Sequence, residues 1–420
     1  MKRIQVFEYH PLKIGVTYDT VEFTESHFNS LVKFNELHKN KYFTVGYKKI
    51  ICKHYVGALQ VNDLVIEILP KADNTTDDKN VWQSVLIDML KSATDVKIKK
   101  VGQAHVNKQN IHLLDIYFEW FLNELQLLIH QGLIKKYYKE TKNTKALKGK
   151  LEFAGHIQKN LVHKERFYTT HQVYDKNHIL HQVLSKALDV IENLSKGSYL
   201  YHKCKKVQLN FPEVSNSKVT EATFNKIILN RKTAPYETVL SIARFIILNY
   251  APNVSSGKEK MFALLFNMNN LWESYVLVRL KKYCGNSYKV LGQQNKTFWG
   301  DNRLRPDIVL KEKGKTYIID TKWKCPKSKS ATVQDLRQMY TYCRFWNAEK
   351  ALLLYPGEDK SYDFKPFKTD DYSNKEKNYV LKMNHQCKMG FVSVVDKNGK
   401  LSKTIGREIL ETLQCNGTTK

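Results

Sequence analysis

Two aspartates and one lysine in the C-terminal part of this sequence have a spacing that could support metal-dependent chemistry. Asp307 begins one apolar run, and Asp320 and Lys322 end the next. Between the runs, Lys313-Gly314 has the composition of a two-residue hairpin loop. Pairing the strands outward from that loop places Asp307 directly opposite Asp320, with Lys322 on the same face. Facing carboxylates repel each other unless a cation lies between them, so the pattern predicts a divalent metal site.

Carboxylate oxygens are hard ligands that favour Mg²⁺, which keeps several waters and shares its coordination with substrate phosphate. Mn²⁺ is the alternative ion. A bound ion would lower the pKa of water and stabilise charge on a scissile phosphate, while Lys322 would orient the water or offset that charge. In the alternative interpretation, Asp307 is a turn residue after Pro306, and Asp320 forms a surface pair with Lys322. The predicted register favours the metal site.

Three further polar residues are candidates for the same site. Glu273 interrupts an otherwise apolar helical stretch, where a carboxylate needs a partner such as a metal ion. A pair with a lysine at the solvent face is an equal alternative for it. Gln338 and Tyr342 are four residues apart and share one face of a predicted helix. They could bind phosphate or hold the carboxylates, although the spacing alone favours an ordinary surface pair.

The elements around these residues predict an α/β domain over 261–420, a mixed sheet flanked by helices. A helix opens this domain, strands and a second helix follow, and two more strands precede a closing helix. The helices are expected at 261–283, 332–346 and 404–414, and the first strands at 288–292, 305–310, 316–324 and 350–356.

Residues 1–100 predict a β-rich domain, and 101–255 a mainly helical middle region. The strands are expected at 13–18, 42–47 and 56–70, with Asn62-Asp63 as a hairpin turn, and a polar linker at 71–80. Helical spacing begins at Val81, and further helices are expected at 110–131, 176–194, 221–230 and 236–249. A polar break at 251–260 ends the region. Within the basic segment 135–167, the run Lys135–Lys150 could contact DNA or a partner, or could be an ordinary solvated loop.

Composition limits the function classes. The 420 residues carry 68 Lys+Arg and 41 Asp+Glu, a formal net charge of +27 that favours a polyanionic partner, most often nucleic acid. Seven scattered cysteines without CxxC spacing disfavour a disulfide framework, a zinc ribbon and an iron–sulfur cluster. Without a membrane-length apolar run, a recognisable secretory leader or a GxxxxGK[ST] loop, we expect a cytoplasmic protein that depends on another chain for nucleotide hydrolysis.

Asp307, Asp320, Lys322 and the Gln338-xxx-Tyr342 pair resemble the PD-(D/E)xK nucleases of the RecB-like type. The wider pattern resembles the McrC family, the nuclease subunits of McrBC and LlaJI-type modification-dependent restriction systems. The motifs that carry this resemblance are residues 147–153, 160, 166–167, 177–180, 266–273, 304–307, 319–324 and 335–340. Family members usually show Arg at position 148 or 150 and Phe at position 272. These are mild departures.

The resemblance implies a Mg²⁺-dependent DNA endonuclease subunit that works with a hexameric McrB-like AAA+ GTPase. That partner would hydrolyse the GTP, recognise modified double-stranded DNA and receive the N-terminal part of this chain in its pore. Two alternatives remain: a GTPase-activating, DNA-binding adaptor with a vestigial nuclease site, and a stand-alone RecB-like repair nuclease. The complete Asp-Asp-Lys set argues against the first, and the long N-terminal portion argues against the second.

Overall fold

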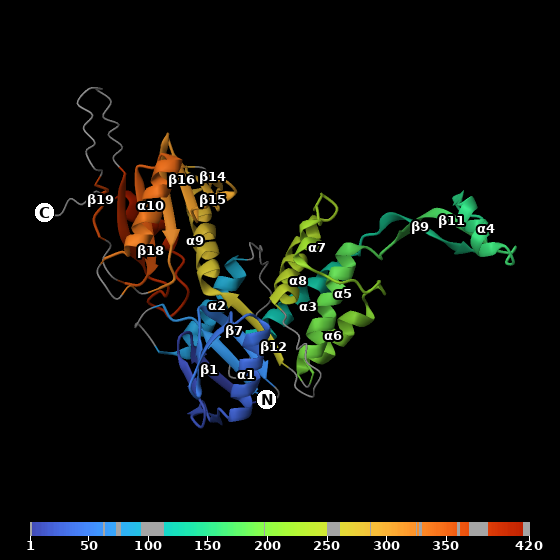
Figure 1. The fold of residues 1–420 in the computed structure, drawn as a ribbon, viewed down its shortest axis with the longest axis horizontal. Coiled ribbons are helices and arrows are strands. Elements are labelled where there is room, and N and C mark those ends of the chain that lie inside the picture. Colours follow the sequence, from blue (N-terminus) through green and yellow to red (C-terminus); the bar gives the residue numbers. More distant parts are fainter. Residues whose placement is uncertain are drawn as a thin grey trace. The chain divides into compact units, whose positions relative to one another are not determined.

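The computed structural model of the protein describes residues 2–61, 64–72, 77–93, 113–196, 198–249, 261–285, 287–324, 326, 330–358, 362–368 and 385–414. The chain forms two compact units (Figure 1). Unit 1 combines Met1–Gln103 with Asn253–Lys420, and unit 2 is Ala104–Pro252. Among the helices in the described ranges, none has both the length and the apolar character that a membrane crossing requires.

A four-stranded sheet of order β1-β8-β7-β12 forms the N-terminal part of unit 1. Its strands are β1 (Lys2–Phe7), β7 (Tyr55–Val61), β8 (Leu64–Leu69) and β12 (Met261–Asn267). β7 and β8 pair as the predicted antiparallel hairpin, up to Val61↔Leu64, while Asn62 and Asp63 lie outside the described residues. Near-continuous apolar sequence suits these strands because both of their faces are buried.

Smaller elements surround this sheet. They are β2 (Pro11–Lys13), β3 (Thr17–Tyr18), β4 (Val21–Glu22), α1 (Glu25–Leu37), β5 (Phe43–Gly46), β6 (Lys49–Cys52) and α2 (Lys79–Ala93). α1 packs against β7, and α2 packs against β8. The predicted strand at 42–47 occurs in shortened form as β5, whereas the predicted single strand at 13–18 is wrong, because a turn separates the end of β2 from β3.

The prediction of a helix over 261–283 is wrong in its first part. β12 pairs antiparallel with β7 from Met261↔Val61 to Asn267↔Tyr55. Helix α9 (Met268–Cys284) begins only after it, where the side chain of Asn267 accepts hydrogen bonds from the first backbone N–H groups. An unbroken apolar run suits a buried strand as well as a buried helix, and the distant partner strand β7 decides between them.

A six-stranded mixed sheet of order β13-β16-β17-β18-β20-β19 forms the C-terminal part of unit 1. Its strands are β13 (Lys289–Gly292), β16 (Ile308–Glu312), β17 (Lys315–Thr321), β18 (Lys350–Pro356), β19 (Lys365–Pro366) and β20 (Gln386–Val392). β16 and β17 are antiparallel, whereas β17, β18 and β20 run parallel. A ribbon that the sequence pattern did not predict, β14 (Lys296–Trp299) with β15 (Asn302–Leu304), precedes β16.

Helices pack against this mixed sheet, as the sequence predicts. α10 (Val333–Trp346) connects β17 to β18, and its buried side chains join the cluster that contains Val309, Ile318 and Leu353. α11 (Ile405–Gln414) packs against α9 and β20. α9 itself also contacts β12, β13 and β17, so one helix touches both the four-stranded and the six-stranded sheet of unit 1 (Figure 1).

Unit 2 is built around helices. They are α3 (Leu113–Gln131), α5 (Ile179–Leu194), α6 (Tyr199–Leu209), α7 (Glu221–Asn225), the short 3₁₀ helix Ala234–Tyr236 and α8 (Glu237–Asn249). α7 ends earlier than the predicted 221–230. Beyond it, Asn230 and Thr233 exchange hydrogen bonds between side chain and backbone, which compete with helical bonding.

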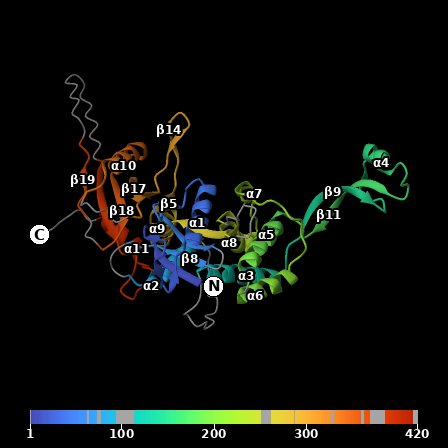
Figure 2. The ribbon, with the colours of Figure 1, turned by 60° about the horizontal axis from the view of Figure 1, so that its bottom comes forward.

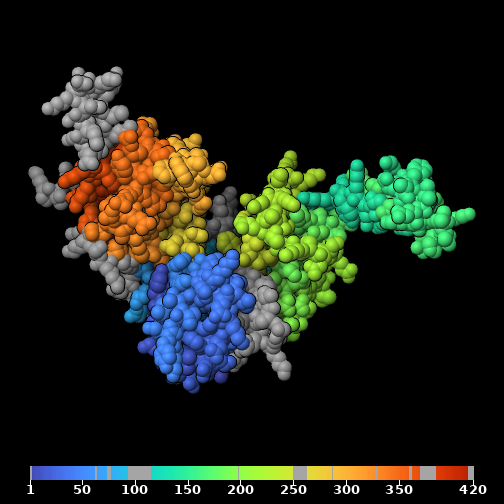
Figure 3. All heavy atoms as spheres, in the orientation of Figure 1, coloured from blue at the N-terminus to red at the C-terminus, as the bar shows by residue number. Residues whose placement is uncertain are grey.

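The basic segment of unit 2 forms a β-arm. β9 (Lys136–Thr144) pairs with β11 (Phe167–Asp175) over its whole length, and β10 (Lys150–Leu151) adds a short third strand. With helix α4 (Phe153–Asn160), the ribbon extends away from the helices of the unit (Figures 1, 2 and 3). The middle region is thus helical only in part, because 136–175 form strands and one short helix.

Candidate active site

The hairpin of β16 and β17 has the predicted register. Its pairs run from Glu312↔Lys315 to Ile308↔Ile319. The loop residues Lys313 and Gly314 have φ values of 43° and 86°. Two positive φ angles are what a type I′ turn requires, and such a turn fixes which residues face each other. Asp307 and Asp320 therefore occupy the next two opposed positions of the hairpin, just beyond the last ladder pair.

Asp320 and Lys322 contact each other directly. Asp320 is only 2% exposed, and its Oδ2 lies 2.7 Å from Lys322 Nζ. The backbone N–H of Lys322 donates to Leu354 O at 2.8 Å, which holds the chain against β18 just after β17 ends. The pair is therefore part of a buried arrangement and is not the surface pair of the alternative interpretation.

Lys322 has a second acidic partner that sequence reasoning missed. Asp335 Oδ1 lies 3.6 Å from Lys322 Nζ, and Asp335 Oδ2 accepts a 3.0 Å hydrogen bond from Lys324. Asp335 is in the first turn of α10, where its N–H donates to the side chain of Thr332. Its position three residues before Gln338 places both on one helix face, which is the signal that could have identified it.

Gln338 and Tyr342 connect this group. Gln338 Oε1 accepts from Lys322 Nζ at 3.3 Å, and its Nε2 donates to Tyr342 Oη at 2.9 Å and to Asp320 Oδ1 at 3.4 Å. Tyr342, which is 6% exposed, donates from its hydroxyl to Arg305 O at 3.1 Å. The two residues are not an ordinary surface pair, since they link both ends of the hairpin to α10.

Glu273 approaches from α9. Its Oε1 accepts a 2.8 Å hydrogen bond from Gln293 Nε2, and the backbone N–H of Gln293 donates to Asp307 O at 2.9 Å. Gln293, just beyond β13, was not predicted, because only the tertiary structure brings it between α9 and β16. It joins Glu273 to the backbone of the first aspartate.

Burial perturbs all three carboxylates, and the charge of Asp307 adds to this effect at the other two. Burial, followed by the charge of Asp307, raises the pKa of Glu273 to about 7. Burial and then Asp307 likewise raise the pKa of Asp320 to about 6, and burial raises that of Asp307. Burial alone would lower the pKa of Lys322, but the charges of Asp320 and Asp335 outweigh it and raise the pKa. Mutually repelling carboxylates beside one ammonium favour the binding of a cation.

The donor set fits a hard divalent cation of the Mg²⁺ type. In the described ranges, no three His, Cys, Asp or Glu side chains already gather closely enough to coordinate an ion by themselves. Asp320 instead contacts Lys322, and Glu273 accepts from Gln293. Mg²⁺ needs only one or two protein carboxylates, because waters and substrate phosphate supply its other ligands. The oxygen donors of Asp307, Asp320 and Glu273 satisfy that requirement.

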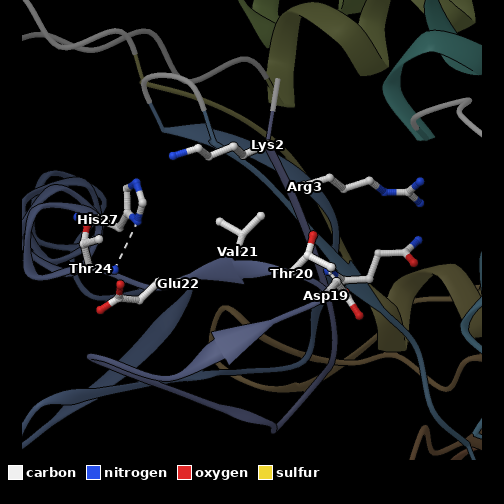
Figure 4. A pocket seen from close by; sticks show the side chains of 9 residues that line it. Lys2, Arg3, Asp19, Thr20, Val21, Glu22, Thr24 and His27 are labelled. Carbon is white, nitrogen blue, oxygen red and sulfur yellow. Dashed lines mark hydrogen bonds between the residues drawn. The ribbon is translucent and has the colours of Figure 1, made fainter.

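A separate cavity of about 660 Å³ lies in the N-terminal part of unit 1 (Figure 4). None of the six predicted site residues lines it. Its lining mixes cationic, acidic and hydroxyl side chains, among them Lys2, Arg3, Asp19, Glu22 and His27. The backbone N–H of Thr24 donates to His27 Nδ1 at 3.2 Å across one side, as part of the cap of α1.

Fold and site together define a class: an α/β protein with an Asp-Asp-Lys centre at one end of a mixed sheet. The chain belongs to the McrBC 5-methylcytosine restriction system component family, whose model matches residues 50–356. The resemblance to McrC that the sequence motifs indicate is thereby confirmed.

Two individual proteins show the similarity. The chain is 22% identical over 225 residues to the type IV methyl-directed restriction enzyme EcoKMcrBC of Escherichia coli K12, a match over 50% of this chain and 64% of that relative. It thus spans less than two thirds of the relative's length. Its fold resembles a chain in the half-complex of Thermococcus gammatolerans McrB AAA+ hexamers with bound McrC, with a TM-score of 0.64 at 16% identity. That likeness covers 98% of this chain and 99% of the other.

Proposed function

We propose that this chain is the Mg²⁺-dependent DNA endonuclease subunit of a McrBC-like, GTP-dependent restriction system that acts on modified DNA. The observation that carries the proposal is the placement of Asp307, Asp320 and Lys322 at one end of the β16–β17 hairpin, with Lys322 Nζ 2.7 Å from Asp320. Family membership and the net charge of +27 support it, since both fit an enzyme that acts on nucleic acid.

Each residue has a definable role in phosphodiester hydrolysis. Asp307, Asp320 and Glu273 would hold Mg²⁺ or Mn²⁺, and the bound ion would supply charge stabilisation at the scissile phosphate. Lys322 Nζ lies 2.7 Å from Asp320, so it would donate to a phosphate oxygen or orient the attacking water. Gln338 and Tyr342 would keep Asp320 and Lys322 in place through the hydrogen bonds described above.

We infer the partner from a protein of similar fold. A solved structure of similar fold contains McrC bound to McrB AAA+ hexamers, and we extend that arrangement to this chain. A McrB-like hexamer would hydrolyse GTP, recognise the modified double-stranded DNA and bind the N-terminal domain of this chain. In this role the protein would act in the cytoplasm, where it would encounter invading DNA.

A cleavage assay tests the proposal. Methylated plasmid is incubated with Mg²⁺ and GTP and with the chain alone, the chain plus its McrB-like GTPase, or the Asp307→Ala variant plus that GTPase. Cutting that needs both the partner and GTP, is lost in the variant and is absent on unmethylated plasmid supports the proposal. Cutting by the chain alone would favour the stand-alone nuclease. Stimulated GTP hydrolysis without cutting would favour the adaptor.

A further inference from the structure

Glu8 is a buried carboxylate that the proposed mechanism does not use. It follows β1 in the N-terminal part of unit 1 and is 6% exposed. Its Oε1 accepts two hydrogen bonds, from the indole Nε1 of Trp323 at 2.6 Å and from the backbone N–H of Lys71 at 3.1 Å. Its Oε2 is buried and has no hydrogen-bond partner among the described residues.

Burial of this carboxylate is unfavourable, because both oxygens lose their hydration and only Oε1 gains hydrogen bonds in return. Burial raises the pKa of Glu8 to about 7 despite both donors. An apolar side chain would usually stabilise such a position as well or better. What an apolar side chain could not do is accept the indole N–H of Trp323.

Trp323 is the next residue in the chain after Lys322 of the proposed active site. It is 4% exposed and lies in the stretch where β17 has ended. Its ring packs on that of Trp272 with centroids 5.4 Å apart, and Trp272 precedes Glu273 on α9. One indole therefore supports the chain on both sides of the site, next to the lysine and next to the third carboxylate.

We propose that Glu8 is a positioning residue of the nuclease centre, which holds Trp323 through its indole N–H and thereby fixes the segment that presents Lys322. The inference rests on the nuclease function proposed above. It makes the N-terminal sheet part of the catalytic geometry: β12 of that sheet leads into α9 and Glu273, and Glu8 beside β1 orients Trp323.

Three variants separate positioning from simple stabilisation. Trp323→Phe keeps an aromatic ring but removes the donor, Glu8→Leu removes the acceptor, and Glu8→Gln keeps an acceptor oxygen. With partner, GTP and Mg²⁺ saturating, we expect the first two to lower kcat about tenfold with little change in KM for DNA, since small misplacements cost catalysis heavily. Glu8→Gln should restore most of kcat. The double variant Glu8→Leu/Trp323→Phe should be no slower than either single one.

Glu67→Gln is the matched control, because Glu67 is a buried carboxylate of the same sheet that binds Arg3 and Gln5. It should change the melting temperature without changing kcat. If Trp323→Phe and Glu8→Leu also change only the melting temperature, the hydrogen bond between Trp323 and Glu8 only stabilises unit 1, and the inference is overturned.

A second measurement needs no cleavage. In the full chain labelled with ¹⁵N-tryptophan, the signal lost in Trp323→Phe identifies that indole among the six tryptophans. We expect this signal to shift when Mg²⁺ is added, in the original chain and in Glu8→Gln, and to lose that response in Glu8→Leu. An indole signal that ignores Mg²⁺ overturns the inference. Failure of the original chain to cut DNA, with the Mg²⁺ response intact, would instead count against the proposed function.

Discussion

Thr321 follows Asp320 in the chain but binds the other aspartate of the site. Its backbone N–H and its hydroxyl both donate to Asp307 Oδ2, at 2.7 and 2.9 Å. These bonds close the hairpin beyond its last ladder pair, Ile308↔Ile319. They also fix the orientation of the Asp307 carboxylate, as the outer partners of metal ligands commonly do.

Thr321→Val should therefore slow DNA cleavage about tenfold, because the hydroxyl donor is lost while the N–H donor and the side-chain shape remain. Thr316→Val is the matched control, a buried threonine on the same strand, and should leave the rate unchanged. Initial rates of plasmid cleavage over a Mg²⁺ titration measure both. Equal rates for the two variants would show that the Thr321 hydroxyl does not orient Asp307.

Asp320→Asn should lower the rate of DNA cleavage at least about a hundredfold but leave stimulation of the partner GTPase intact. The substitution removes a charge at the proposed metal site and keeps the side-chain shape. Because burial and Asp307 raise the pKa of Asp320 to about 6, the neutral side chain should not lower the melting temperature at pH 8. Loss of both activities would refute a separation of nuclease and GTPase-stimulating roles.

Tyr342→Phe should lower the cleavage rate severalfold. The change removes the hydroxyl that accepts from Gln338 and donates to Arg305 O, so Gln338 is free to turn away from Asp320 and Lys322. Tyr340→Phe on the same helix is the control, since Tyr340 contacts the rings of Phe367 and His385. A Tyr342→Phe enzyme as fast as this control would assign the pair a purely structural role.

The local part of this site was predictable from the sequence, and the tertiary part was not. Lys313-Gly314 determines a two-residue turn, and the turn determines the register that aligns Asp307 with Asp320. The local sequence is therefore sufficient to predict this alignment. Gln293 and Asp335 reach the site only because β13 and α10 pack against the hairpin. Helical spacing could have placed Asp335 on the face of Gln338, but no local pattern reveals which residue of the hairpin either segment contacts.

The same distinction explains the errors in the fold. β12 reads as a helix because its apolar run has no period of two, and its identity depends on β7, which lies far away in the sequence. The basic arm has an alternating burial pattern in β9, but lysines occupy so many positions that the hydrophobic signal of a strand is absent. α10, whose apolar side chains recur at helical spacing and whose cap is Thr332, was predicted correctly.

The pH dependence of stability should differ between the original chain and Glu8→Gln. Glu8 binds its proton more tightly in the folded state, with a pKa of about 7 against an ordinary 4.5, so its contribution to stability falls as the pH rises from about 4.5 to 7. The difference in the free energy of unfolding between the two proteins should change by up to about 3 kcal/mol over this pH interval, since one pKa unit corresponds to about 1.4 kcal/mol.

Neighbouring groups do not obscure this effect. Burial raises the pKa of Cys52 to about 12, and burial with the Glu8 charge raises that of Tyr9, so neither titrates in the interval. Glu273 and Asp320 titrate equally in both proteins and cancel from the difference. Urea unfolding at pH 5 and pH 8 measures it, and parallel curves would place the Glu8 pKa near its ordinary value.

Gly57→Ala should break the pairing of β12 with β7 in the four-stranded sheet. Gly57 has a φ of +135° and faces β12, where an added Cβ would lie 2.1 Å from Leu264 O. The backbone oxygen of Leu264 cannot move away from the added Cβ while Leu265 stays paired with Gly57. β12 must therefore separate from β7. We expect a loss of about 3 kcal/mol or more in the free energy of unfolding.

Gly15→Ala separates the clash from the backbone conformation, because Gly15 also has a positive φ, +78°, but open space around the position of a Cβ. It should cost only about 1 kcal/mol. Since α9 continues directly from β12, Gly57→Ala should also displace Glu273 and reduce cleavage by the protein that remains folded, whereas Gly15→Ala should not. Equal effects of the two substitutions on stability and cleavage would mean that β12 does not hold Glu273 in place.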